Sequence, residues 1–147
     1  MKNNSTKNYF LHCVQPERDI QDLEFVQIDR FLKKKSKNKN VNSVFIGDLL
    51  EYFDYDDASI VISDILNKLE PGTTLIIQGI DSKSICQSFG SDELLPPIFN
   101  MLIYGKGKKS IFTFPTIKYI VESKENLEVS KIKFLDSIHY YIECIKK

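Results

Sequence analysis

Short apolar runs recur along the chain and are separated by polar or charged segments. The runs at 9–14, 25–29 and 44–46 have the length of buried strands, and each ends at a turn or a polar residue. An α-helix is predicted next, because apolar residues recur at three- and four-residue steps at Ile62, Ile65, Leu66 and Leu69. Strands that alternate with a helix predict an α/β fold.

The middle of the chain continues this pattern. Glu70-Pro71-Gly72-Thr73 is predicted to end the helix, and the near-continuous apolar run at 74–78 predicts a central strand covered on both faces. A further helix is expected to begin at 82–88, with Gly90 in the left-handed conformation that often follows a helix end. The apolar segment 98–104 predicts another short helix.

The last third of the chain predicts a helix and then two strands. Pro115 suits the first turn of a helix whose apolar face carries Ile117, Ile120 and Val121. The runs at 129–134 and 140–145 follow with only a short turn between them. We therefore expect a mostly parallel sheet with an antiparallel pair at its C-terminal edge.

The first crossover of the predicted sheet is short. Ten residues, 15–24, separate the first two apolar runs, too few for a full crossover helix with its loops, so the first βαβ unit is abbreviated. With 147 residues, the chain has the length of one domain, and we expect a single domain over 1–147.

Charge limits the classes of partner. Lysine plus arginine equals aspartate plus glutamate at 20 each, which argues against a broad nucleic-acid-binding face. The basic stretch Lys33 to Asn40 is interpreted as a solvated loop or helix end, with a phosphate-binding patch as the alternative. No segment reaches the length of a membrane span.

Cysteine and histidine usage argues against a metal centre. Cys13, Cys86 and Cys144 are far apart and odd in number, so neither a disulfide framework nor a zinc site is predicted. His12 is expected to be a hydrogen-bonded core residue and His139 to be exposed, with no acid at ligand spacing from either. Reduced cysteines indicate a cytoplasmic protein or a component of a viral particle.

Several short motifs occur together in a characteristic order. They are Leu11-His12-Cys13-Val14, Phe25-Val26-Gln27-Ile28-Asp29, Leu49-Leu50-Glu51-Tyr52-Phe53, Leu69-Glu70-Pro71-Gly72-Thr73 and Ile103-Tyr104-Gly105-Lys106. This series resembles the class I S-adenosylmethionine-dependent methyltransferases. It is most similar to a small subgroup with an L-x-L-G-C-G turn, an F-x-N-V-D strand, a V-L-E-H-F segment and an L-K-P-G-G helix end.

The resemblance implies a Rossmann-like methyltransferase fold with S-adenosylmethionine as the cofactor. The positions it assigns to cofactor binding are Cys13, Val14, Gln15, Asp29 and Gly47. Asp29 would accept hydrogen bonds from the ribose, although an aspartate that caps a turn explains the same residue. Asp48 borders the family's methyl-transfer centre and is the catalytic candidate; the other acids near it, Glu51 to Asp57, suit a loop and the amino end of a helix.

The expected cofactor loop departs from the family pattern. Where relatives have glycines that let the backbone approach the cofactor, the stretch from His12 to Pro16 contains none. Val14 is β-branched and Pro16 lacks an amide donor. We therefore predict that conventional cofactor binding is lost and that the domain binds a small molecule or a protein partner, for instance within a viral assembly. The alternative is an active methyltransferase acting on a small molecule or glycan.

Overall fold

A six-stranded sheet forms the centre of the molecule. The structure, a computed structural model, describes residues 7–12, 24–34, 40–105 and 107–147. The strands are β1 (Lys7–His12), β2 (Glu24–Gln27), β3 (Val41–Ile46), β4 (Thr74–Ile80), β5 (Leu127–Phe134) and β6 (His139–Lys146). Their spatial order is β2-β1-β3-β4-β6-β5.

The sheet is parallel over its first four strands and antiparallel at its C-terminal edge. Parallel pairing joins β2 to β1, β1 to β3 and β3 to β4. The strand β6 runs antiparallel to both β4 and β5. The predicted fold class, a mostly parallel α/β sheet with an antiparallel C-terminal pair, is confirmed.

Five helices and two short 3₁₀ segments complete the described part of the chain. They are α1 (Ile28–Lys33), η1 (Asp48–Tyr52), η2 (Tyr55–Asp57), α2 (Ala58–Asn67), α3 (Ser82–Gly90), α4 (Pro96–Tyr104) and α5 (Phe114–Glu122). The helices predicted from Ile62, from 82–88, from 98–104 and from Pro115 are therefore present as α2, α3, α4 and α5.

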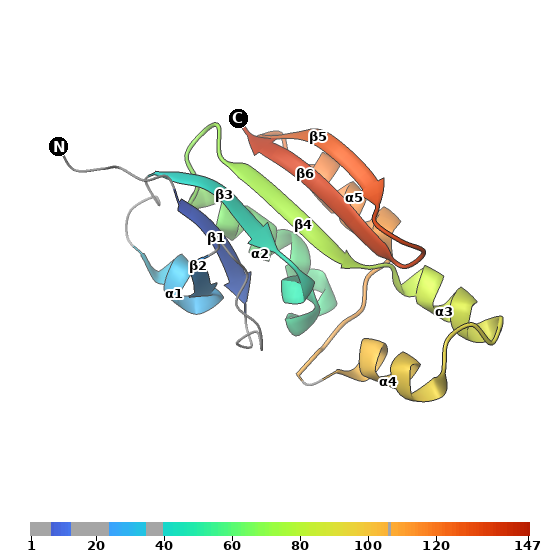
Figure 1. The fold of residues 1–147 in the computed structure, drawn as a ribbon. Helices are drawn as coiled ribbons and strands as arrows, with labels where there is room; N and C mark the ends of the chain where they lie inside the picture. The colour runs from blue at the N-terminus through green and yellow to red at the C-terminus, as the bar shows by residue number, and fades with distance from the viewer. Residues whose placement is uncertain (1–6, 13–23, 35–39, 106) are drawn as a thin grey trace.

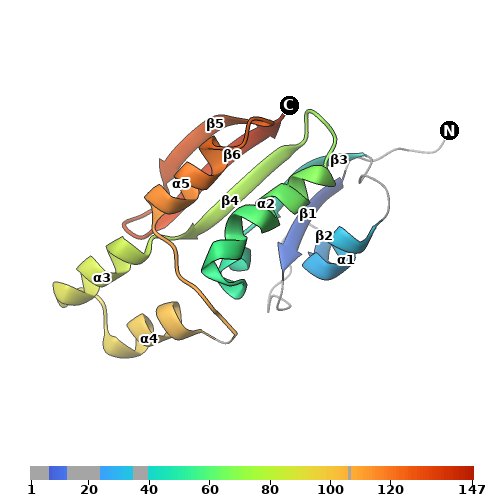
Figure 2. The ribbon, with the colours of Figure 1, turned by 180° about the vertical axis from the view of Figure 1, so that it is seen from behind.

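The core lies on one face of the sheet. Leu11, Ile46 and Ile77 are fully buried, and so are Ile62 and Ile65 of α2. Figure 2 shows α1, α2 and α5 together in front of the sheet, and in Figure 1 the opposite face is turned toward the viewer with none of the described helices over it. We call these the helix face and the open face.

The prediction that the fourth strand is covered on both faces is wrong. Along β4 every second residue is buried, and Ile76, Gln78 and Ile80 between them are only half-buried. Alternating burial is typical of a strand with one covered face. The apolar residues at half-buried positions, chiefly Ile76 and Ile80, hid this alternation in the sequence.

Two predicted boundaries also need correction. The second strand ends at Gln27, and Ile28 and Asp29 already belong to α1, because Ile28 and Phe31 are spaced to bury one side of that helix. Gly90 is the last residue of α3 and does not have a positive φ; Asp92 takes the left-handed conformation, with φ 60°. A short aspartate side chain tolerates that conformation better than most residues do.

Candidate functional site

The candidate site lies where four parallel strands end. Because β2, β1, β3 and β4 are parallel, their carboxyl ends meet along one border, which we call the carboxyl edge. In open α/β sheets, ligands bind outside the carboxyl ends of the strands. Of the residues proposed from sequence, Asp29, Gly47 and Asp48 lie at this edge, whereas Cys13, Val14 and Gln15 are outside the described residues.

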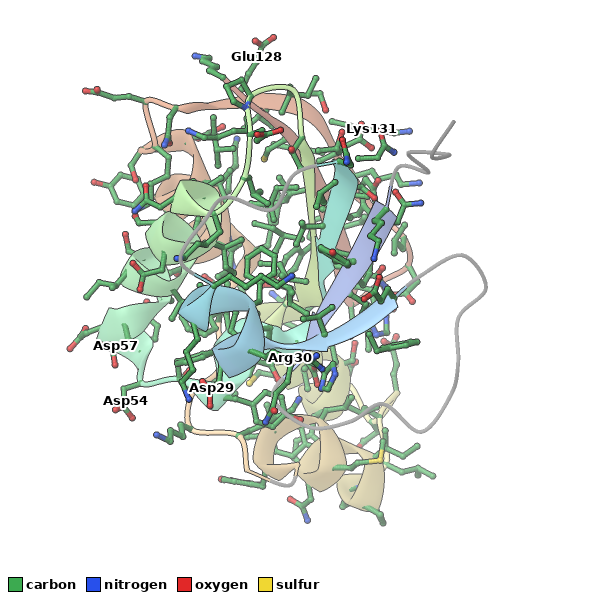
Figure 3. All side chains as sticks on the ribbon, turned by 90° about the vertical axis from the view of Figure 1, so that its left-hand side faces the viewer. Asp29, Arg30, Asp54, Asp57, Glu128 and Lys131 are labelled. Atoms are coloured by element: carbon green, nitrogen blue, oxygen red, sulfur yellow. The ribbon has the colours of Figure 1, made fainter. Side chains whose placement is uncertain are left out.

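A pocket of about 430 Å³ lies at the β2 end of the carboxyl edge. We call it the β2 pocket; it is lined by His12, Glu24, Phe25, Val26, Gln27, Arg30 and Lys34. An adjoining hollow of about 400 Å³ is lined by Gln27, Asp29, Arg30, Lys33 and Lys34. Asp29 thus shares this hollow with two cations of its own short helix, Arg30 and Lys33, and with Lys34 just after it. Asp29 and Arg30 lie in the corner of the molecule that faces the viewer in Figure 3.

Asp29 stands in the first turn of α1 rather than at the end of a strand. Its side chain is exposed, and it forms no hydrogen bond or ion pair with a described residue. The turn-capping alternative therefore has no support in the geometry, since no side-chain bond caps this helix. The carboxylate remains available to a ligand that enters the adjoining hollow.

His12 ends β1 and lines the β2 pocket. Only 8% of its surface is exposed, and its Nδ1 has no hydrogen-bond partner among the described residues. The prediction of a hydrogen-bonded core histidine is therefore wrong for this atom. Burial lowers the pKa of His12, which favours the neutral imidazole.

A second pocket of about 340 Å³ lies nearer to β4, on the open face of the sheet. We call it the β3 pocket; it is lined by Phe10, Phe45, Gly47, Asp48, Gln78, Gly79, Ile80 and His139. The rings of Phe10 and Phe45 stack with centroids 5.1 Å apart. At Gly47 a Cβ would meet the Phe10 ring at 3.4 Å, so a larger residue there would intrude on these rings.

His139 joins this pocket because of strand register. It pairs with Ile80 across β6 and β4, which sets it on the open face beside the end of β4. The imidazole Nδ1 lies 2.7 Å from Oδ2 of Asp136. Oδ1 of Asp136 accepts the backbone N–H groups of Ile138 and His139, at 2.8 and 2.7 Å. These two backbone bonds are the main reason that the pKa of Asp136 is lowered.

This arrangement can support acid–base chemistry. A carboxylate that holds Nδ1–H fixes the tautomer in which Nε2 can accept a proton. Asp48, exposed at the start of η1, lines the same pocket. The expectation that no acid lies at ligand spacing from His139 is wrong: Asp136 stands three residues before it and contacts its Nδ1. That spacing was the only local signal for the contribution of His139.

A buried ion pair supports the β4 end of the edge. Glu51 of η1 pairs with Lys108, and each side chain is only 9% exposed. Lys108 also donates to the carbonyl of Leu102, and the carbonyl of Glu51 accepts the N–H groups of Lys109 and Ser110. Burial raises the pKa of Glu51, and the Lys108 ammonium opposes that rise. The pair ties the segment after α4 to η1.

The remaining acids near Asp48 do not form a site. Asp54, Asp56 and Asp57 are exposed before α2, in keeping with the predicted helix amino end (Figure 3). Within the described ranges, no three His, Cys, Asp or Glu side chains are placed to hold a metal ion. None of the described helices is both long and apolar enough to cross a membrane.

No protein-family model and no curated protein sequence matches this chain. Solved structures do match it. The PH0226 protein from Pyrococcus horikoshii has a TM-score of 0.66 at 11% identity, covering 97% of this chain and 82% of that one. An S-adenosylmethionine-dependent methyltransferase from Anabaena variabilis has a TM-score of 0.64 at 7% identity, covering 99% and 79%.

A third solved structure contains a cofactor product. Magnesium protoporphyrin IX methyltransferase (ChlM) from Synechocystis, crystallised with S-adenosylhomocysteine (SAH), has a TM-score of 0.54 at 13% identity. The match covers 86% of this chain, which spans about half, 52%, of the ChlM chain. At such low identities the likeness establishes the fold, and the fold is that of the Rossmann-like methyltransferases.

Proposed function

We propose that this chain is a methyltransferase-fold module that binds a small molecule or a protein partner and no longer holds S-adenosylmethionine in the usual way. The observation that carries the proposal is the set of side chains at and after the end of β1, where relatives have glycines. His12 is buried there, and the next four residues of the sequence include no glycine. Side chains thus follow β1 where a cofactor needs bare backbone.

The charges near Asp29 support the same proposal. S-adenosylmethionine carries a positive sulfonium, whereas Arg30, Lys33 and Lys34 line the hollows at β2. Of the two acids that line them, only Asp29 lacks an ion pair with a described residue. Like charges at short range weaken binding, even where solvent screens them. The residues present at this end therefore fit the cofactor poorly.

Calorimetry with S-adenosylmethionine and SAH tests the proposal. We expect no saturable heat and no thermal shift at millimolar ligand, because a ligand that binds only the folded state must stabilise it by mass action. An Asp29→Ala variant is the matched control. Saturable binding by the natural chain that Asp29→Ala abolishes would overturn the proposal, because it would show a working ribose contact.

The β3 pocket favours one second candidate, an active methyltransferase on a small molecule or glycan. Here His139, oriented by Asp136, could accept the proton of an acceptor hydroxyl that lies against Phe10 and Phe45. S-adenosylmethionine would supply the methyl group. If the calorimetry detects the cofactor, this candidate requires that His139→Ala lower the rate of methyl transfer while leaving cofactor binding unchanged.

A further inference from the structure

Three cations cluster at the β2 end of the carboxyl edge. Arg30, Lys33 and Lys34 fall within five residues, in and just after the last turn of α1. Arg30 and Lys34 line the β2 pocket, and Lys33 joins them around the adjoining hollow. The guanidinium of Arg30 forms no hydrogen bond or ion pair with a described residue. Its planar set of donors suits an oxyanion that can accept two parallel bonds.

The acids nearby do not neutralise this cluster. Glu24 lines the β2 pocket, but its carboxylate is paired with Lys7 at 3.1 Å. Of the two acids that line the hollows, Glu24 and Asp29, only Asp29 has no ion pair with a described residue, and it lies near three cations. Basic residues also stabilise the carboxyl end of a helix, so the cluster needs a second observation before it indicates a ligand.

That second observation is His12. Its side chain reaches the β2 pocket from β1, opposite Gln27 in the strand register, and is more than nine-tenths buried. Buried polar atoms are normally hydrogen-bonded, and the Nδ1 of His12 is an exception within the described part of the chain. His12, the exposed amide of Gln27 and the guanidinium of Arg30, which has no partner among the described residues, line a single pocket.

The position of Lys34 is fixed from two sides. Its ammonium lies 5.5 Å from the centre of the Tyr9 ring, and its carbonyl accepts a hydrogen bond from Nζ of Lys68 on the neighbouring helix end. The end of α1 is therefore held against the sheet, with Arg30 and Lys34 lining the β2 pocket and Lys33 lining the adjoining hollow. A rigid arrangement of donors reduces the entropy that a ligand must overcome.

We propose that the β2 pocket binds a small phosphate-bearing ligand, held by Arg30 and Lys34 with His12 and Gln27 as further polar contacts. This inference rests on the proposed function, since a pocket that serves a phosphate cannot serve a sulfonium in the same place. A volume of about 430 Å³ is within the range of small-molecule sites.

The test is a calorimetric titration of the full chain with inorganic phosphate and with pyrophosphate, at fixed ionic strength. Acetate in a parallel titration separates phosphate from carboxylate chemistry. Arg30→Gln removes the proposed contact. Lys83→Gln is the matched control, because Lys83 is exposed on α3, lines neither hollow and carries the same charge.

We expect saturable binding of pyrophosphate that Arg30→Gln weakens by about tenfold, as for loss of one charge-assisted hydrogen bond. Lys83→Gln should change the affinity by less than about twofold. The absence of phosphate binding would overturn the inference and leave the proposed function intact. Equal weakening by both variants, or preference for acetate, would also overturn it.

Histidine NMR gives an independent readout. The chain has only His12 and His139, so each imidazole can be followed separately. The charged groups that line the pocket with His12 are Glu24, Arg30 and Lys34. A bound phosphate should raise the pKa of His12 and leave the resonances of His139 in place. Binding that leaves the His12 signals unchanged would place the anion outside this pocket and would overturn the inference.

Discussion

At the β4 end of the carboxyl edge, buried polar groups bond to one another across the fold, whereas at the β2 end the charged groups stand in solvent. Asp81, buried after β4, accepts bonds from the backbone of Ser84 at 3.2 Å and of Phe114 at 2.7 Å. Lys108 and Glu51 form a buried ion pair. Asp29 and Arg30 have no such partner among the described residues.

This difference predicts that the β4 end contributes mainly to folding stability and the β2 end mainly to ligand binding. Polar groups that bond within the protein maintain its structure and have little left to offer a ligand. Charged groups that face solvent contribute little to stability and keep their bonding capacity. The β4 end should therefore respond to mutation mainly through folding, and the β2 end mainly through ligand affinity.

The largest effect is expected from Lys108→Met. Removal of the ammonium leaves the Glu51 carboxylate buried without its counter-charge, which typically costs about 3–5 kcal/mol of unfolding free energy. Urea denaturation measures this loss. The double variant Glu51→Leu with Lys108→Met should recover most of it, because no buried charge remains. A single variant as stable as the natural chain would show that the pair is not buried in solution.

Asp81→Ala is expected to have the next largest effect. One carboxylate caps the start of α3 and also holds the first N–H of α5, so its loss should cost about 2 kcal/mol. Asp64, exposed on α2, is the matched control, and Asp64→Ala should change stability by no more than about 0.5 kcal/mol. Thermal unfolding of the two variants measures the difference. Equal losses would contradict the role assigned to Asp81.

Arg30→Gln should leave folding unaltered. Its guanidinium is exposed and unbonded within the described residues, so the change in unfolding free energy should stay within about 0.5 kcal/mol. The same variant is expected to lose phosphate affinity, as argued above. Denaturation and calorimetry on one preparation measure both quantities. A large loss of stability would show that Arg30 belongs to the framework, and the contrast between the two ends would fail.

Local patterns made most of the fold predictable. The helix through Ile62 and Ile65 and the antiparallel pair at the end of the chain follow from apolar spacing within a few residues. At the carboxyl edge, Gly47 and Asp48 were proposed from the family resemblance, and they directly follow β3. Their neighbour in the pocket, His139, was not proposed, because its place depends on the register of β6 against β4 across nearly sixty positions of sequence.

The sequence did not predict the open face of the sheet, for a different reason. A strand with one exposed face is recognised by polar residues at alternate positions, and β4 carries Ile76 and Ile80 there. The basic stretch was assigned to a loop or helix end, with a phosphate-binding patch as the alternative; α1 does end at Lys33, and residues 35–39 lie outside the described residues. Only the fold brings Arg30 of α1 and His12 of β1 to the same pocket.

The smallest effect concerns pH and the burial of His12. Because burial lowers the pKa of His12 in the folded protein, the unfolded chain, with an ordinary pKa near 6.5, binds more protons in the interval below that value. The unfolding free energy should therefore fall as the pH drops through 6.5 toward the folded pKa, and level off below it. His12→Phe removes the titrating group, so the variant should show a flatter pH dependence of its unfolding free energy than the natural chain.

His139→Phe is the control, and urea denaturation at pH 5.0 and 7.5 measures both variants. If His12→Phe leaves the slope unchanged, the imidazole is as well solvated in the folded state as in the unfolded chain, and the phosphate inference loses the buried histidine on which it draws.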